Sequence, residues 1–197
     1  MSVALPTKKV TFTLEDIGPN LLESITKGLY TNPFHVIREY VQNEIDAKPP
    51  PTQISVVIDG RNISIRGDGC GMNDGDIQLA KRIGFSTKDP EESVGFRGIG
   101  IWSGVAVCDL LIISTKREGE YKKHVLTIDA SGIRREIDNR TSKNLAELLS
   151  DHITRTEVDA GALDHGTHVE LRGVVKEAAD LLDEDQVRKY MALVLPV

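Results

Sequence analysis

The chain has 197 residues, of which 40% are hydrophobic and 27% charged, and its formal net charge at pH 7 is −6. These values suit one globular domain with a substantial core, and the acidic balance excludes a general attraction to nucleic acid while leaving a local basic patch open. Cys70 and Cys108 form no CxxC pair, so we expect reduced thiols rather than a zinc site or a disulfide framework. No apolar run approaches the roughly 20 residues of a membrane span, and the N-terminus lacks the apolar core of a secretory signal, so we expect a cytoplasmic protein without a membrane partner.

Two helices and a hairpin are predicted in the first third of the chain. Apolar residues recur at helical spacing over 14–29, and a second helix is predicted to begin at Asn32-Pro33, with Asn32 as its cap. Alternating residues over 53–59 and 62–66, joined by a short glycine turn, predict a β-hairpin.

The second helix carries polar residues among apolar ones. Glu39, Asn43 and Asp46 occur at i, i+4 and i+7, and therefore share one face of the helix. Polar groups beside a core are costly when they are buried without partners, so they need a ligand, a metal or each other. A plain solvated face is the alternative.

Two glycine-rich segments follow, each with a functional and a structural interpretation. Gly67-Asp68-Gly69-Cys70-Gly71-Met72 leaves the hairpin, and Ser93-Val94-Gly95-Phe96-Arg97-Gly98-Ile99-Gly100-Ile101 leads into a predicted helix over 98–108. A glycine loop entering a helix gathers N–H groups and the positive dipole end, which favours phosphate. The polar stretch 84–92 between them is a candidate lid. A plain turn and a closely packed helix are the alternatives.

The second half is predicted to continue the α/β pattern. Its acidic excess between Glu147 and Asp185 is attributed to a solvated surface. The predicted strands are 109–115, 121–129, 133–137 and 165–171, and the predicted helices are 142–152 and 176–195.

Several familiar site types are absent from the sequence. It contains neither G-x-x-x-x-G-K-[ST] nor G-x-G-x-x-G, which excludes P-loop, protein-kinase and dinucleotide-binding interpretations on motif grounds. His165 and His168 have a spacing that a metal could use, although two histidines of a surface turn are the simpler interpretation.

Four ordered motifs resemble those of the GHKL ATPases, the superfamily of gyrase B subunits, 90-kDa heat-shock chaperones, sensor histidine kinases and MutL-type repair proteins. They are Arg38-Glu39-x-x-x-Asn43-x-x-Asp46-Ala47, Asp68-Gly69-x-Gly71-Met72, Gly95-Phe96-Arg97-Gly98-x-Gly100 and Gly166-Thr167. The resemblance covers about residues 33–171. It implies the Bergerat fold, an α/β (α+β) two-layer sandwich whose mixed, largely antiparallel sheet is covered on one face by helices. Residues 1–197 then form a single ATP-binding domain, with 1–12 as a candidate flexible arm and 84–97 as the ATP lid.

The resemblance also implies cofactors, ATP and Mg²⁺, and a role for each motif residue. Glu39 is the expected general base and Asn43 the expected magnesium ligand. The remaining expected contacts are Asp46 near the adenine or the hairpin, Asp68 and Thr167 at the adenine edge, Gly69 and Gly71 under the base, Met72 on its face, Gly95, Phe96, Arg97, Gly98, Ile99 and Gly100 around the phosphates, and Lys88 at the γ-phosphate.

The motif style is closest to MutL-like, MORC-like and chaperone members. A departure is Ile99-Gly100-Ile101-Trp102-Ser103, where MutL proteins usually continue with Glu-Ala-Leu. The presence of Glu39 favours ATP hydrolysis. We expect ATP to close the lid and to promote formation of a homodimer. C-terminal domains or a partner beyond residue 197 are expected to complete the site. The alternatives are a nucleotide-gated binding module with negligible turnover alone and, less favoured, a histidine-kinase-type phosphotransfer domain. The sequence does not identify the molecule on which the ATPase acts, and nucleic acid is one of the candidates.

Overall fold

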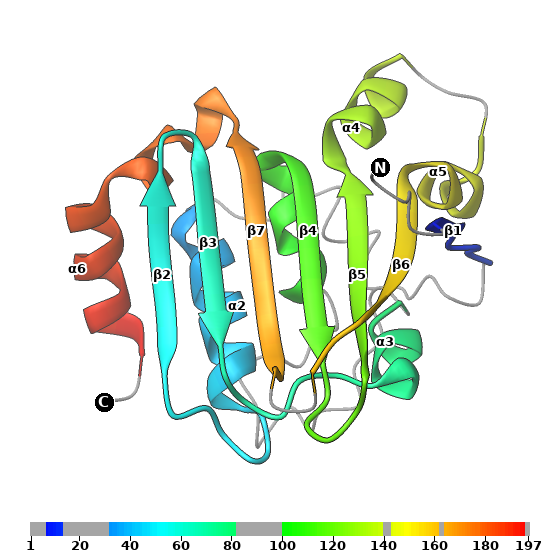
Figure 1. Ribbon diagram of the computed structural model, residues 1–197. Coiled ribbons are helices and arrows are strands. Elements are labelled where there is room, and N and C mark those ends of the chain that lie inside the picture. The colour runs from blue at the N-terminus through cyan, green and yellow to red at the C-terminus, as the bar shows by residue number, and fades with distance from the viewer. Residues whose placement is uncertain (1–6, 14–31, 82–99, 140–142, 162–163, 196–197) are drawn as a thin grey trace, which may run out of the picture.

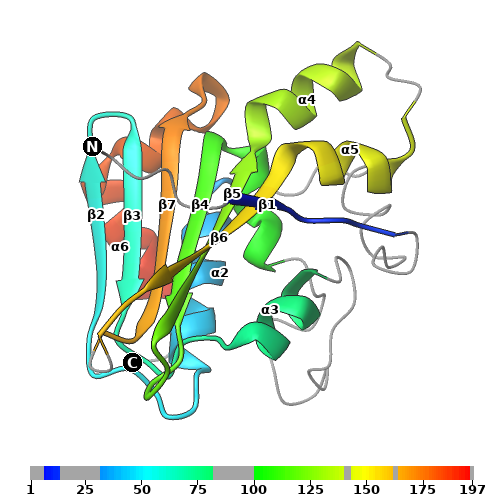
Figure 2. The same cartoon turned by 45° about the vertical axis from the view of Figure 1, so that its right-hand side comes forward.

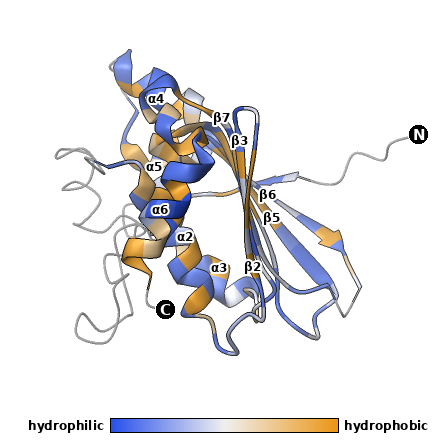
Figure 3. Ribbon diagram, turned by 90° about the vertical axis from the view of Figure 1, so that its left-hand side faces the viewer, coloured by the Kyte–Doolittle hydropathy of each residue, from blue (hydrophilic) through white to orange (hydrophobic). Residues whose placement is uncertain are grey.

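The computed structural model describes residues 7–13, 32–81, 100–139, 143–161 and 164–195, and these form two layers (Figure 1). One layer is a seven-stranded sheet in the order β1-β6-β5-β4-β7-β3-β2, in which every pair of neighbouring strands is antiparallel. The helices lie on one face of this sheet (Figure 3). This arrangement confirms the expected Bergerat-type sandwich.

The strands are β1 (Thr7–Lys9), β2 (Ile54–Asp59), β3 (Asn62–Gly67), β4 (Cys108–Lys116), β5 (Lys122–Asp129), β6 (Ile153–Asp159) and β7 (Gly166–Val174). The helices are α2 (Phe34–Ile45), α3 (Asp74–Lys81), α4 (Ala130–Asp138), α5 (Leu145–His152) and α6 (Glu184–Val194), with 3₁₀ helices η2 (Gly100–Ala106) and η3 (Lys176–Leu182). None of the helices in the described ranges is long and apolar enough to cross a membrane.

Strand β7 brings together segments that are distant in the sequence. It pairs on one side with β3, where Thr167 lies opposite Gly67, and on the other side with β4, where Thr167 lies opposite Thr115. The predicted hairpin of β2 and β3 is confirmed, and its turn glycine, Gly60, has a φ of +58°. The last residues of β3 and β4 and the first residues of β7 therefore lie side by side at one end of these three neighbouring strands.

The core lies between the sheet and α2. The alternating residues Ile63 and Ile65 of β3 and Leu111 of β4 are buried against Val36 and Ile37 of α2. Each fully buried aliphatic side chain contributes roughly 1.5–3 kcal/mol relative to an exposed one. This burial fixes the face that α2 turns toward the sheet.

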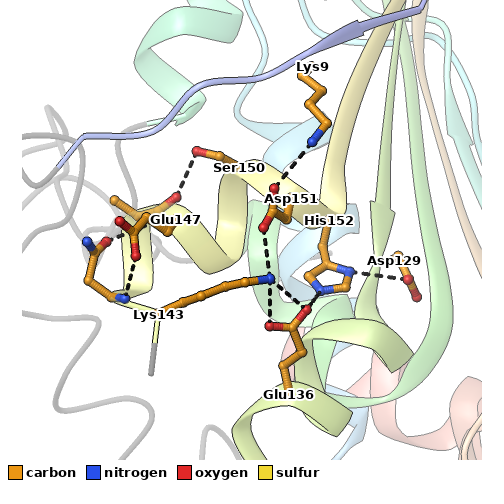
Figure 4. A network of polar contacts seen from close by, with 10 residues as sticks. Lys9, Asp129, Glu136, Lys143, Glu147, Ser150, Asp151 and His152 are labelled. Carbon is orange, nitrogen blue, oxygen red and sulfur yellow. Dashed lines mark hydrogen bonds and ion pairs between the residues drawn. The ribbon is translucent and has the colours of Figure 1, made fainter. Parts of the chain in front are cut away.

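Local capping explains where several helices begin. The side chain of Asn32 accepts a hydrogen bond of 3.0 Å from the backbone N–H of Phe34, so the expected cap of α2 is present. Asn73 accepts from the N–H of Asp76 at 2.8 Å at the start of α3. Helix α5 has a full capping box between Asn144 and Glu147 (Figure 4).

Three predictions for the second half of the chain were wrong or incomplete. Residues 133–137 belong to helix α4 instead of a strand, because Asp129 accepts a hydrogen bond from Gly132 N–H and starts a helix there. The predicted helix 176–195 is two helices, η3 and α6, and Asp183 separates them by capping α6. Strand β6 was not predicted, since its exposed acidic residues were attributed to a solvated surface.

The N-terminal residues add an edge strand. Within the expected flexible arm, Thr7–Lys9 form β1, which pairs antiparallel with β6 (Figure 2). The predicted helix over 14–29 lies outside the described residues. At the opposite edge of the helical layer, α6 docks on α2 through a stack of Tyr190 on Phe34, with ring centroids 5.4 Å apart.

Candidate functional site

Helix α2 presents Glu39 and Asn43 toward the start of η2. A Cβ built on Gly100 would sit 2.8 Å from Oε2 of Glu39 and 3.5 Å from Nδ2 of Asn43. Any larger residue at position 100 would crowd these two side chains. The structure thus brings together three of the sequence-predicted site residues, Glu39, Asn43 and Gly100.

Two hydrogen bonds hold η2 in this place. The hydroxyl of Tyr40 on α2 accepts from the backbone N–H of Gly104 at 2.9 Å. The indole N–H of Trp102 donates to the carbonyl of Ala80 in α3 at 3.0 Å. The predicted helix after the glycine motif is therefore present as a 3₁₀ helix, and it is anchored to both α2 and α3.

The first glycine segment forms a tight loop against the ends of β4 and β7. Gly71 has a φ of +64°, and a Cβ there would sit 2.6 Å from the carbonyl carbon of Lys116. The ring of His165 donates from Nδ1 to the carbonyl of Gly69 at 2.9 Å. A side chain at position 71 would collide with β4, so glycine is required by both the backbone angle and the space.

The hydroxyl of Thr115 links this loop to Thr167. It accepts from the backbone N–H of Met72 at 2.9 Å and lies 3.1 Å from the hydroxyl of Thr167. Met72 itself lines a small apolar pocket with Ile113 and His124. Thr115 was not predicted as a site residue, because no sequence pattern distinguishes it from other threonines in strands.

Asp68 is held firmly at the beginning of the loop. Its Oδ1 accepts from the backbone N–H groups of Thr52 at 2.8 Å and of Gln53 at 2.9 Å, and its Oδ2 accepts from the Thr52 hydroxyl. The hydroxyl and N–H groups of Thr52 and Gln53 lower the pKa of Asp68, so this carboxylate stays ionised near neutral pH.

A second carboxyl group, from Glu44, lies beside this loop. The side chain of Glu44 is only 8% exposed, and a Cβ on Gly67 would sit 2.7 Å from its Cδ. Burial raises the pKa of Glu44 to about 7, although a hydrogen bond with Thr167 acts in the opposite direction and the charge of Asp68 adds to the rise. Sequence reasoning missed Glu44, yet its spacing from Ile37, Tyr40 and Val41 places it on the buried stripe of α2.

The other predicted site residues divide into two groups. Asp46 lies at the end of α2, where its Oδ1 accepts from the side chain of Gln42 at 2.8 Å. The rest lie outside the described residues, as does the whole of the expected lid 84–97. They are Lys88, Gly95, Phe96, Arg97, Gly98 and Ile99.

The residues present fit a magnesium ion bound together with phosphates. Within the described ranges, no three or more His, Cys, Asp or Glu side chains converge on a metal position. Asn43 offers an amide oxygen, and its side chain lies with the Glu39 carboxylate beside Gly100. Magnesium is commonly held by one or two protein oxygens, with phosphate and water completing its shell. Asn43 would hold the ion, and the other ligands would come from the nucleotide.

The fold and site together define a class of ATP-binding domain. An open antiparallel sheet carries helices on one face, and on that face a Glu–Asn helix meets the glycine loop after β3 and Gly100. Such domains are the Bergerat-fold ATPases. The family model described as "Histidine kinase-, DNA gyrase B-, and HSP90-like ATPase" matches residues 30–162, and the chain belongs to this family.

Similar proteins point to one branch of the family. The chain is 25% identical over 194 residues to the DNA mismatch repair protein MutL of Rickettsia prowazekii, covering 93% of the chain and 30% of that protein. It is 30% identical over 174 residues to MutL of Nitrobacter winogradskyi, covering 83% of the chain and 26% of the relative. The domain is therefore MutL-like, and it spans about a third or less of the length of these relatives.

Proposed function

We propose that this domain binds ATP with magnesium and hydrolyses it. The observation that carries the proposal is the meeting of Glu39 and Asn43 with Gly100, which puts a carboxylate and an amide beside a backbone position without a side chain. In this role, Glu39 orients the attacking water and accepts its proton, while Asn43 holds the magnesium ion. When bound, the ion neutralises the charge of the phosphates.

The base of the nucleotide would lie at the other end of the site. Asp68 would accept from the adenine amino group, Met72 would pack on the ring, and Thr167 would lie at its edge. The close approach of the Gly69–Gly71 backbone to β4 and β7 supports this assignment. The proposal has three further parts. Asp46 would lie near the base, and Lys88 would contact the γ-phosphate. The remaining phosphate contacts would come from Gly95, Phe96, Arg97, Gly98 and Ile99.

Magnesium-dependent ATP hydrolysis by the 197-residue chain tests this function. Glu39→Ala should abolish phosphate release and leave ATP binding by calorimetry within about threefold of wild type, since only the base is removed. The matched control is Glu118→Ala, which removes an exposed carboxylate from the turn after β4 and should keep full activity. Turnover that survives Glu39→Ala contradicts the assignment of the base.

The larger biological role is proposed from the relatives. They are named as DNA mismatch repair proteins, which supports a DNA-transaction machine in which ATP closes the lid and joins two copies of the domain. Sedimentation with a non-hydrolysable ATP analogue checks this step, and a monomer at saturating analogue speaks against it.

The alternative is a nucleotide-gated module that binds ATP but turns over only with the rest of its protein. This alternative is supported by the match covering only 30% of the relative, since the remainder of such a protein could be needed for turnover. It predicts saturable ATP binding, lost in Asp68→Asn, without phosphate release by this chain alone.

A further inference from the structure

We propose that Glu44 is a specificity-determining residue of the nucleotide site, whose carboxyl group accepts a second hydrogen bond from the exocyclic amino group of the base. This inference rests on the proposed function and names a contact within the same site. Within it, Asp68 takes one N–H of the amino group and Glu44 takes the other. The pair then selects adenine over purines with a carbonyl oxygen at that position.

The position of Glu44 is the first support. The side chain leaves α2 one residue after Asn43 and points into the space between α2 and the end of β3. Its Cδ comes within 2.7 Å of where a Cβ of Gly67 would be, so the absence of a side chain at Gly67 makes room for this carboxyl group. A carboxylate this deeply buried costs free energy unless polar partners compensate for it. The fold keeps it directly beside the expected base contacts Asp68 and Thr167.

The saturation of Asp68 is the second support. An ionised carboxylate has about four acceptor positions. Three donors from Thr52 and Gln53 already bind the oxygens of Asp68. Asp68 is therefore left with about one acceptor position. An amino group offers two N–H donors, and a second acceptor must come from another residue.

Thr167 and Glu44 are the two neighbours that could supply that second acceptor. The hydroxyl of Thr167 donates to Glu44 and lies 3.1 Å from the hydroxyl of Thr115, which accepts from the N–H of Met72 and donates to the carbonyl of Gly166 at 3.2 Å. A carboxyl group has an acceptor oxygen whether or not it carries a proton, so one oxygen of Glu44 can bind Thr167 while the other accepts from the base. We assign the contact to Glu44 because its two oxygens offer more acceptor positions than the single hydroxyl oxygen of Thr167.

Each missing hydrogen-bond partner of the amino group should weaken nucleotide binding. A lost hydrogen bond of this kind weakens binding by about tenfold. Wild-type protein should bind N6-methyl-ATP, which has one N–H on the amino nitrogen, about tenfold more weakly than ATP. Glu44→Ala should bind ATP about tenfold more weakly than wild type, and it should no longer distinguish ATP from N6-methyl-ATP.

Calorimetric titration of ATP, N6-methyl-ATP and inosine triphosphate against the full chain measures these ratios. Glu44→Gln is the rescue variant: its amide oxygen is still an acceptor, so the preference for ATP over both analogues should return. A purely structural role of Glu44 would weaken all three nucleotides equally. Glu177→Ala, on an exposed position of η3, is the matched control and should leave every ratio unchanged.

The outcomes separate this inference from the proposed function. If ATP binds and Asp68→Asn abolishes binding, but the ratio of ATP to N6-methyl-ATP is the same in wild type and Glu44→Ala, the role of Glu44 is overturned and the nucleotide site stands. If wild-type protein binds none of the three nucleotides at millimolar concentration, the proposed function fails, and the inference fails with it. Thermal unfolding of each variant confirms that the ratios come from folded protein.

Discussion

Gly100 lies so close to Glu39 that the carboxylate occupies the space a side chain at position 100 would need. The Cβ of an alanine there would sit 2.8 Å from Oε2 of Glu39 and 3.8 Å from its Cβ. Since Oε2 is the far end of a flexible side chain, the carboxylate would turn away and the backbone would stay in place. The glycine therefore controls where the proposed base points.

Gly100→Ala should lower the rate of ATP hydrolysis without unfolding the protein. A displacement of about 1 Å at a reacting group costs on the order of 10²-fold in rate, so we expect at least a tenfold loss in kcat. The control is Gly161→Ala, because a Cβ at Gly161 meets no atom within 4 Å. A Gly100→Ala protein with wild-type kcat would show that Glu39 does not act from the observed position.

The two glycines Gly71 and Gly60 allow the cost of a contact to be separated from the cost of backbone strain. Their φ angles are +64° and +58°, but a Cβ at Gly71 meets the carbonyl of Lys116, whereas a Cβ at Gly60 meets nothing within 4 Å. Gly60→Ala should lower the free energy of unfolding by about 1–2 kcal/mol, the usual cost of a left-handed residue. Gly71→Ala should cost at least about 1 kcal/mol more. Urea unfolding measures the loss of stability in each variant. Equal losses would mean that the loop at Gly71 moves away from Lys116 at no cost in free energy.

The sequence predicted the elements whose periodicity is set by burial on one face. Helix α2 and the β2–β3 hairpin followed from apolar spacing, and their caps and turns contain the residue types that such positions require. That Glu39, Asn43 and Gly100 belong to one site was expected from the resemblance to the GHKL motifs. Their proximity in space could not be predicted from the sequence, because it depends on the packing of η2 beside α2.

The failures have physical causes in particular residues. Ile133 and Ile137 suggested alternation, but Asp129 caps a helix through Gly132, and Ile137 follows Ile133 by four positions, about one turn of that helix. Strand β6 was hidden because neither of its faces is continuously apolar and its C-terminal end carries Glu157 and Asp159. Glu44 was overlooked because a charged residue is expected on the surface, and only the packing of α2 against β3 shows that it is buried.

The hydroxyl of Tyr40 connects stability to the site. It accepts the backbone N–H of Gly104 inside the protein, so Tyr40→Phe should leave that donor without its partner and cost about 1–3 kcal/mol in the free energy of unfolding. Because the same bond holds η2 against α2, hydrolysis should fall as well. Tyr121→Phe is the control, since Tyr121 is 70% exposed. Unchanged stability in Tyr40→Phe would indicate that another group takes the Gly104 N–H.

His152 joins α4 to α5 through two carboxylates (Figure 4). Its Nε2 lies 2.9 Å from Oε1 of Glu136, and its Nδ1 lies 3.3 Å from Oδ2 of Asp129. Hydrogen bonds from His152 and then Lys143 lower the pKa of Glu136 below its usual value. The helices α4 and α5 are therefore held together by a contact that depends on an ionised Glu136.

The direction of this shift sets how stability changes in acid. A carboxyl group with a lowered folded-state pKa stabilises the protein above its unfolded pKa of about 4.5, and the contribution is lost as pH falls through the lower folded value. Wild-type protein should therefore lose stability between about pH 5 and pH 3. In His152→Ala the pKa of Glu136 moves back toward its usual value, so the urea midpoint should be lower at pH 6 but should fall less on acidification. Leu193→Ala, at a non-titratable position that is 85% exposed, is the control and should keep the full acid-dependent fall. A His152→Ala protein that loses as much stability in acid as wild type would show that the histidine does not hold Glu136 ionised.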